Sequence, residues 1–159
     1  MGKYAKQVWI SAPPEDVVEA IDTPDTWRII VPSMQDAEEI ELDDGGFRLA
    51  FTYKLAGIRT DRAIETSGSD PAADGSGTQH VFDLSGSVTG SYTFDVSEQG
   101  VGTRVKFDTQ YNFSNRVLDR VTRRFLNQYV TRQFDSLLMN LKDYLEMEKD
   151  GIEPESITD

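Results

Sequence analysis

The sequence of 159 residues contains no cysteine and a single histidine, His80. The lack of cysteine excludes disulfide bonds, thiolate zinc sites and a cysteine nucleophile. A lone histidine excludes any metal site built from several histidines, and we expect no metal. No apolar run reaches the roughly 18 residues that suggest a membrane span, so we expect no stable membrane insertion. The N-terminus also lacks the apolar segment of a signal peptide, which predicts a cytoplasmic protein.

Basic residues are scarce, with 16 Lys and Arg against 28 Asp and Glu and a formal net charge of -12. This charge repels a phosphate backbone, so we expect no nucleic-acid partner, and it disfavours general attachment to anionic membranes. The 17 Asp outnumber the 11 Glu. Short, hydrated carboxylates suit molar salt, where the Debye length falls to about 3 Å. We therefore expect a salt-adapted, halophilic protein, the alternative being an ordinary acidic one, and unfolding measured against KCl distinguishes them.

No recognisable nucleotide-binding or hydrolase motif is present: the sequence lacks a P-loop, a dinucleotide fingerprint and a Gly-x-Ser-x-Gly elbow. We therefore expect no cofactor. The length predicts one domain over residues 1–149, followed by an acidic flexible tail over 150–159.

Alternation of apolar and polar residues predicts seven strands. These cover residues 3–12, 36–42, 47–55, 58–67, 79–85, 88–96 and 103–113. Pro14 and Thr23-Pro24 each start a short helix after the first strand. Residues 67–77 are rich in Gly, Ser, Asp and Pro, which predicts a mobile loop.

A long helix is predicted from Ser114 or Asn115 to about Lys149. Its apolar residues step by three and four along the chain: Leu118, Val121, Phe125, Tyr129, Val130, Phe134, Leu137, Leu141 and Leu145. The jump at Tyr129-Val130 indicates a wide buried face or a bend. Seven strands with one apolar face need a cover, and this helix is the only element large enough. The expected class is therefore α+β, with a curved antiparallel sheet around a C-terminal helix.

The segment ISAPPEDVVEAI at 10–21, followed by DTPDTW at 22–27, resembles the opening of the START/Bet v 1-like (SRPBCC) superfamily. Within it, the chain is similar to the polyketide cyclase/dehydrase and lipid transport group. The resemblance covers residues 3–149 and implies the helix-grip fold, with a cavity between the sheet and the long helix. Members often carry a second Trp after the first, whereas Arg28-Ile29-Ile30 follow Trp27 here, so the rim of the pocket is expected to differ.

Inward-facing aromatic residues supply the candidate ligand-binding surface. They are Phe51, Tyr53, Phe82, Tyr92, Phe94, Phe107, Tyr111, Phe125 and Tyr129. Buried tyrosine hydroxyls need partners, which a ligand or water in a cavity would provide. Apolar walls with a few polar groups describe a small-molecule site. The alternative is that these rings simply fill the core.

Three polar features have two interpretations each. His80 shares a face with Phe82 and could act on a ligand, or it is an ordinary buried or rim residue. Arg62 is in phase with Ile64 and could pair with an acidic ligand group, or it is a surface arginine. Arg116, Arg120 and Arg123, with Arg124 nearby, form a basic stripe. This stripe meets an anionic lipid headgroup or acidic partner, or pairs with the protein's own acids, such as Asp119.

Three functions remain open at this stage. The first is binding or transport of a hydrophobic small molecule such as a lipid, isoprenoid or quinone. The second is a cyclase or dehydratase, in which His80, Arg62 and a pocket Tyr share acid–base work. The third is an adaptor whose groove holds a partner protein. The lack of a recognisable catalytic set favours a binding protein over an enzyme, and the sequence does not fix the oligomeric state.

Overall fold

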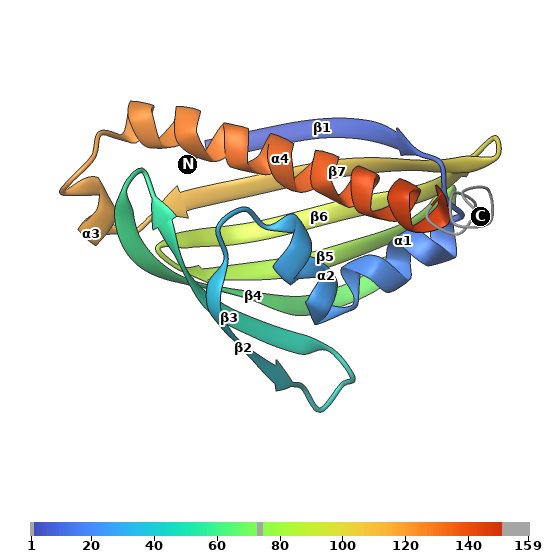
Figure 1. The fold of residues 1–159 in the computed structure, drawn as a ribbon, viewed down its shortest axis with the longest axis horizontal. Helices are drawn as coiled ribbons and strands as arrows, with labels where there is room; N and C mark the ends of the chain where they lie inside the picture. The colour runs from blue at the N-terminus through green and yellow to red at the C-terminus, as the bar shows by residue number, and fades with distance from the viewer. Residues whose placement is uncertain (1, 73–74, 151–159) are drawn as a thin grey trace, which may run out of the picture.

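The computed structural model describes residues 2–72 and 75–150 and contains a single curved sheet with helices on its concave side (Figure 1). The elements in chain order are β1 (Gly2–Ile10), α1 (Pro14–Ile21), α2 (Pro24–Ile30), β2 (Gln35–Glu41), β3 (Phe47–Leu55), β4 (Ile58–Pro71), β5 (Gly77–Gly86), β6 (Val88–Gln99), β7 (Gly102–Phe113), α3 (Asn115–Leu118) and α4 (Arg123–Asp150). The strand order is β1-β7-β6-β5-β4-β3-β2, and every neighbouring pair is antiparallel. The predicted α+β class and seven-stranded sheet are confirmed.

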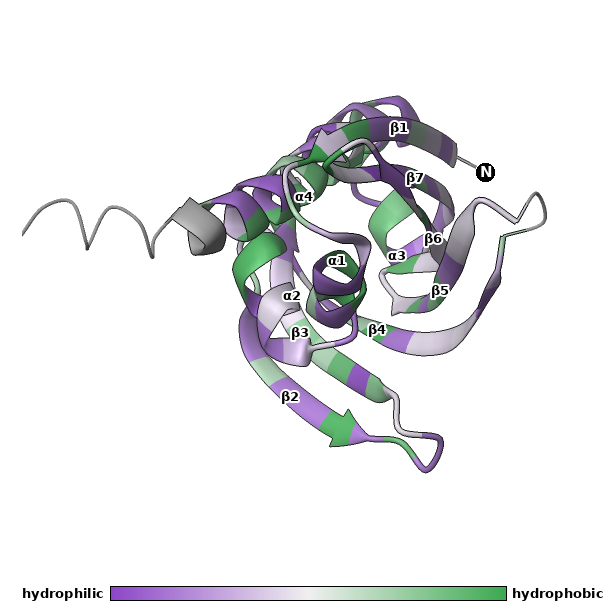
Figure 2. Ribbon diagram, turned by 90° about the vertical axis from the view of Figure 1, so that its right-hand side faces the viewer, coloured by the Kyte–Doolittle hydropathy of each residue, from purple (hydrophilic) through white to green (hydrophobic). Residues whose placement is uncertain are grey.

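Curvature brings the two ends of the sheet towards the helices, and Figure 2 shows the strands bending around α1, α2 and α4. Gly90 in β6 has a φ of 136°, and a Cβ there would lie 1.9 Å from the carbonyl oxygen of Gln110 in β7. Only glycine allows this close approach of backbone to backbone. The close pairing of β6 with β7 at this position therefore requires glycine.

Alternation along the strands places one face of the sheet in the core, as predicted. The buried set in β3 is Phe47, Leu49, Phe51, Tyr53 and Leu55. The matching set in β7 is Val105, Phe107, Thr109, Tyr111 and Phe113. Helix α4 covers these residues with Leu126, Val130, Phe134, Leu137, Leu138, Leu141 and Leu145. The core thus lies between the concave face and α4.

The loop predicted over residues 67–77 is wrong for most of its length. Strand β4 continues to Pro71, and β5 begins at Gly77, with Ser69 opposite His80 and Pro71 opposite Thr78. A register shift between Thr66 and Gly68 leaves Ser67 without a partner on β5, and the ladder then resumes. Loop-like composition misled the prediction because this hairpin extends past the core, where strands need no apolar face. The hairpin tip at 73–74 lies outside the described residues.

The long helix predicted from residue 114 is two helices. One turn, α3, ends at Leu118, and α4 begins at Arg123. Thr122 caps the second helix: its Oγ1 accepts a hydrogen bond from the Phe125 N–H at 3.3 Å, and its carbonyl accepts from the Leu126 N–H at 3.0 Å. The helical phase therefore restarts at Thr122.

This restart changes which residues face inward. Phe125, predicted to be buried, is 52% exposed, and Leu126 takes the inward position instead. From Val130 onward the predicted apolar stripe is confirmed. The expected acidic tail falls almost wholly on residues 151–159, outside the described residues. Among the described helices, none combines the length and apolarity needed to cross a membrane.

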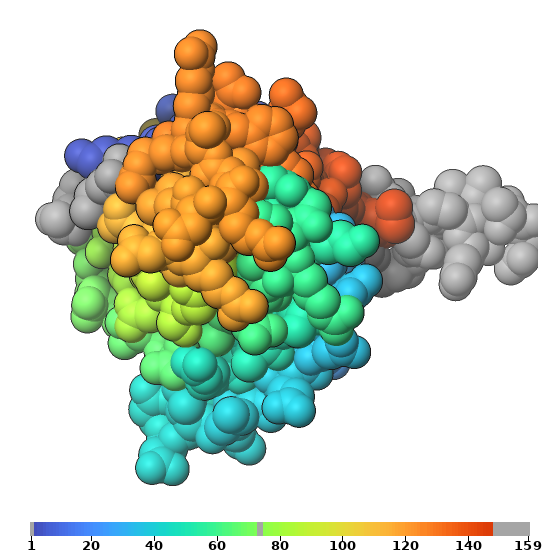
Figure 3. Space-filling view, turned by 90° about the vertical axis from the view of Figure 1, so that its left-hand side faces the viewer, coloured from blue at the N-terminus to red at the C-terminus, as the bar shows by residue number. Residues whose placement is uncertain are grey.

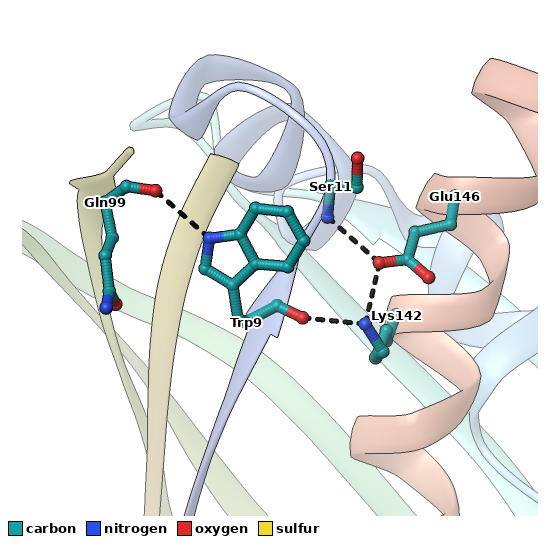
Figure 4. A network of polar contacts seen from close by, with 5 residues as sticks. All are labelled: Trp9, Ser11, Gln99, Lys142 and Glu146. Carbon is teal, nitrogen blue, oxygen red and sulfur yellow. Dashed lines mark hydrogen bonds and ion pairs between the residues drawn. The ribbon is translucent and has the colours of Figure 1, made fainter. Parts of the chain in front are cut away.

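A polar network fastens the second half of α4 to the end of β1 (Figure 4). The Lys142 ammonium donates to the Trp9 carbonyl and pairs with Glu146, both at 2.7 Å. Glu146 also accepts the Ser11 N–H at 2.9 Å, and the Trp9 indole N–H donates to the Gln99 carbonyl at 3.0 Å. These bonds join α4, β1 and the β6–β7 turn. They hold the helix at the end of the sheet opposite α3.

Candidate ligand-binding site

Arg62, on β4, is buried in the concave face of the sheet with only 5% of its surface exposed. Its Nη2 donates a hydrogen bond of 2.7 Å to the Tyr92 hydroxyl oxygen. The guanidinium carbon lies 5.0 Å from the centre of the Tyr53 ring and 5.8 Å from that of Phe51. Within the described residues, no carboxylate forms an ion pair with this guanidinium. The alternative of a surface arginine is therefore wrong.

Strand register explains how the sequence builds this cluster. Arg62 is directly opposite Phe51 on β3, and Tyr53 lies two residues further along that strand on the same face. Tyr92 comes from β6, where its partner on β7 is Thr109. Residues of β3 and β6 thus converge on the charged group of Arg62 in β4.

Several polar atoms of this cluster have no hydrogen-bond partner. They are the Tyr53 hydroxyl and Arg62 Nε, and the buried hydroxyl of Thr109, opposite Tyr92 in the ladder, has no partner either. The Tyr92 oxygen accepts from Arg62, but its own O–H hydrogen has no acceptor among the described residues. Burial raises the pKa of the Tyr92 hydroxyl, and the nearby Arg62 charge only partly opposes this shift. Tyr92 is therefore a neutral donor at physiological pH.

Such a cluster is suited to an acceptor group from outside the protein. Arginine stays protonated inside proteins, and a buried charge without a partner is costly. Contacts with aromatic faces offset part of that cost. A carboxylate, enolate or carbonyl oxygen would receive hydrogen bonds from Arg62, Tyr92 and Tyr53 together.

A pocket of about 470 Å³ opens where β4 begins, at the end of the sheet closed by α3. Its lining residues are Ile58, Arg59, Thr60, Asp61, Gly86, Ser87, Ser114, Arg116 and Val117. Thr60 precedes Arg62 by two residues on β4, so the two share a face about 7 Å apart. Figure 3 views this end, where the orange residues of α3 and early α4 lie against the green β3–β4 segment. The pocket therefore adjoins the arginine cluster.

The middle of the concave face is filled by aromatic rings. Trp27 packs on Phe82 at 5.1 Å between ring centres, Phe94 on Phe107 at 4.9 Å, and Tyr92 on Phe107 at 5.2 Å. Phe134 of α4 closes the group against Tyr92 and Phe107. Of the predicted aromatic set, only Phe51, Tyr53 and Tyr92 accompany Arg62, whereas Phe82, Phe94 and Phe107 pack as core.

The remaining predicted tyrosines fasten α4 to the strands. The Tyr111 hydroxyl donates to Asn127 Oδ1 at 3.3 Å, and the Tyr129 hydroxyl donates to the Lys54 carbonyl at 3.1 Å. Tyr129 is only partly buried, and Phe125 points to solvent. No contact between these three residues and Arg62 is found within the described residues.

His80 belongs to a different part of the molecule. It lines a pocket of about 240 Å³ with Asp22, Asp44 and Thr66, near the opposite end of β4 and β5. Its Nε2 lies 2.7 Å from the Thr78 hydroxyl, and its buried Nδ1 has no partner. The structure thus separates His80 from Arg62, which sequence reasoning had considered together. No group of three or more His, Asp or Glu suited to a metal occurs among the described residues.

His80 gives a pH-dependent contribution to stability. Burial lowers its pKa, and Asp22 and Asp95 only partly oppose this shift. Below about pH 6.5 the unfolded chain therefore binds a proton at His80 more readily than the folded chain does. The free energy of unfolding consequently decreases as the pH is lowered. We expect the stability difference between wild type and His80→Gln to shrink as pH falls through this range, measured by urea unfolding. A difference that stays constant from neutral to acidic pH contradicts this assignment.

Apart from Arg116 of the basic stripe, sequence reasoning missed the residues of the pocket near α3. The Ser87 hydroxyl donates a hydrogen bond of 3.1 Å to the Thr60 hydroxyl there, and Val117 is the buried residue of α3. Alternation along β4 would have placed Thr60 on the face of Arg62. No local sequence pattern indicated that Ser87 and Ser114 line a pocket, because both lie at strand ends that are brought together only by the fold.

Solved structures share this architecture at low sequence identity. A protein from Thermus thermophilus superposes with a TM-score of 0.71 at 16% identity, covering 91% of this chain and 97% of that one. A START superfamily protein from Mycobacterium smegmatis gives 0.69 at 14% identity, with coverages of 91% and 97%. Zhui aromatase/cyclase from a Streptomyces species gives 0.69 at 16% identity, with coverages of 92% and 94%. These likenesses show the fold alone.

No curated protein matches the sequence at a significant level. A family match, in contrast, extends over residues 1–146, nearly the whole described domain, and agrees with the helix-grip arrangement of sheet and helix. The chain belongs to the family described as polyketide cyclase / dehydrase and lipid transport.

Proposed function

We propose that this protein binds a hydrophobic small molecule, such as a lipid, isoprenoid or quinone, whose acidic or carbonyl group contacts Arg62. The observation that carries the proposal is the buried guanidinium without a carboxylate partner, which lies over the ring of Tyr53, whose hydroxyl forms no hydrogen bond. A protein that needed Arg62 only for stability would gain by pairing it or replacing it with an apolar residue. The head group of a ligand supplies the missing partner.

The pocket beside α3 is the proposed entrance. Its volume of about 470 Å³ falls in the range of small-molecule sites, roughly 300–1,000 Å³. The single turn of α3 is held beside the pocket by buried Val117 and by the hydrogen bond of 3.0 Å from the Ser114 N–H to the Ser87 carbonyl. The head group then passes Thr60 to reach Arg62, and the apolar part stays under α3. The family description includes lipid transport, which agrees with such a cargo.

A cyclase or dehydratase is the second candidate. Arg62 and the Tyr92 O–H would hold a carbonyl oxygen and stabilise negative charge as it develops there. Zhui, which shares the fold, is itself named an aromatase/cyclase. Aromatic rings fill the middle of the concave face, and His80 lines a different pocket. A catalytic site would therefore lie around Arg62.

A matched series of ligands tests the binding proposal. Dodecanoic acid, dodecanol and dodecylamine share one alkyl chain and differ in head group. We expect the acid to bind roughly ten- to a hundredfold more tightly than the amine, because hydrogen bonds to a charged group contribute about 1.5–3 kcal/mol. Titration calorimetry measures these affinities. Equal affinities overturn the head-group assignment, and no saturable binding by any of the three overturns the function.

Incubation with a cell extract followed by native mass spectrometry distinguishes the two candidates. A co-purifying molecule of unchanged mass supports the carrier. A bound molecule that loses water on incubation supports the dehydratase.

A further inference from the structure

Four arginines surround the junction between α3 and α4: Arg116, Arg120, Arg123 and Arg124. All four side chains are exposed. Asp119 is the only acidic residue between positions 109 and 134, in a chain whose net charge is -12. The junction is therefore a local basic surface on an acidic protein.

These arginines do not pair with the protein's own acids. None of the four takes part in an ion pair within the described residues, although Asp119 is adjacent in sequence. Arg28, Arg48 and Arg59, in contrast, each pair with an Asp or Glu. The alternative that the basic stripe serves internal pairing is thus wrong for the described residues.

An exposed aromatic ring and a pocket adjoin this basic surface. Phe125 follows Arg123 and Arg124 directly and is 52% exposed. Arg116 and Val117 line the pocket of about 470 Å³. The orange residues of this segment form much of the molecular surface at that end (Figure 3). Charge, an apolar anchor and the mouth of the pocket are therefore found together.

We propose that this end of the molecule, with α3 and the start of α4, docks reversibly on the surface of an anionic lipid bilayer. Guanidinium groups bind phosphate through paired hydrogen bonds, and each basic residue near an anionic surface strengthens binding roughly fivefold. An aromatic side chain beside them enters the headgroup region. This inference rests on the proposed function, because docking on a bilayer would serve to collect a poorly soluble ligand from it.

The overall negative charge does not prevent such docking. Repulsion by distant carboxylates is screened beyond a Debye length of about 8 Å at physiological ionic strength. The acids nearest to this surface in the chain and the pocket lining are Asp119 and Asp61, fewer than the four arginines. Contact through one end keeps the acidic remainder away from the membrane. The docking is peripheral.

Sedimentation with vesicles tests the proposal. Phosphatidylcholine vesicles with and without phosphatidylglycerol are mixed with the wild type, with Arg120→Gln/Arg123→Gln, and with Phe125→Ala. We expect the wild type to bind only the anionic vesicles. The double variant should bind roughly 25-fold more weakly, from two factors of about five. Phe125→Ala should weaken binding without removing its dependence on phosphatidylglycerol.

Arg104→Gln/Lys106→Gln is the matched control, because it removes the same charge from exposed positions near the other end of the sheet. It should sediment like the wild type. Equal losses in both double variants, or no sedimentation of the wild type, overturn the proposal. Arginine-dependent capture of an acidic protein without vesicle binding overturns it as well. Because the vesicles carry no cargo, failure here leaves dodecanoic acid binding in solution as an independent test of the proposed function.

Discussion

The Arg62→Met variant should bind dodecanoic acid roughly ten- to a hundredfold more weakly while folding about as stably as the wild type. The loss follows because the charge-assisted hydrogen bonds to the head group disappear, a change of about 1.5–3 kcal/mol. Folding survives because methionine has a similar shape and removes a buried charge that has no carboxylate partner among the described residues. Calorimetry and urea unfolding measure the two effects separately.

Tyr92→Phe is the informative companion to this substitution. It removes the hydrogen-bond partner of Arg62 and leaves the guanidinium buried, so we expect a loss of about 1–3 kcal/mol in stability. The double variant Arg62→Met/Tyr92→Phe removes both groups and should recover that loss. If Arg62→Met instead unfolds the protein, while the double variant stays equally unstable, Arg62 is structural and the binding site lies elsewhere.

Trp27→Ala should lower the free energy of unfolding by about 3–5 kcal/mol, the usual result of removing a large buried ring. Trp27 is fully buried and contacts Phe82, Tyr92 and Phe94. Its indole N–H also donates to the Ile21 carbonyl at 2.8 Å, which ties α2 to the end of α1. Urea denaturation followed by far-UV circular dichroism gives this value directly.

Trp9→Ala is the matched control for Trp27→Ala. Trp9 is 41% exposed and contributes one indole hydrogen bond and a contact with Lys142. Its loss should be about 1 kcal/mol. Similar losses at the two positions would mean that the helices do not depend on Trp27 for their place under the sheet.

The strands and their buried faces could be predicted because period-two alternation is a local property. Phe47 to Leu55 and Val105 to Phe113 show it clearly, and both sets are buried. Two local features misled the prediction. The helix break depended on a Thr122 cap inside an otherwise helical pattern, and so Phe125 was assigned to the wrong face. The β4–β5 hairpin had the composition of a loop.

The candidate site was harder to predict than the fold. Phase along β4 placed Arg62 on the inward face, but its burial depends on rings from β3 and β6 that are distant in sequence. Most of the aromatic residues were identified correctly as inward-facing, yet phase does not tell which rings fill the core and which surround a polar group. Ring-to-ring contacts decide that, and they arise only when the sheet has curved.

Strand β2 forms one free edge of the sheet, and its side chains are largely exposed. It carries four acidic residues, of which Asp36 and Glu39 pair with Arg59 and Arg28. Glu38 and Glu41 form no ion pair within the described residues, so a second copy approaching this edge meets like charges there. A register shift between Gln35 and Glu38 further disrupts the backbone groups offered for pairing. Replacing Glu38 and Glu41 with Gln removes charge from this edge without changing the length of either side chain. We therefore expect self-association of such a variant to begin at β2.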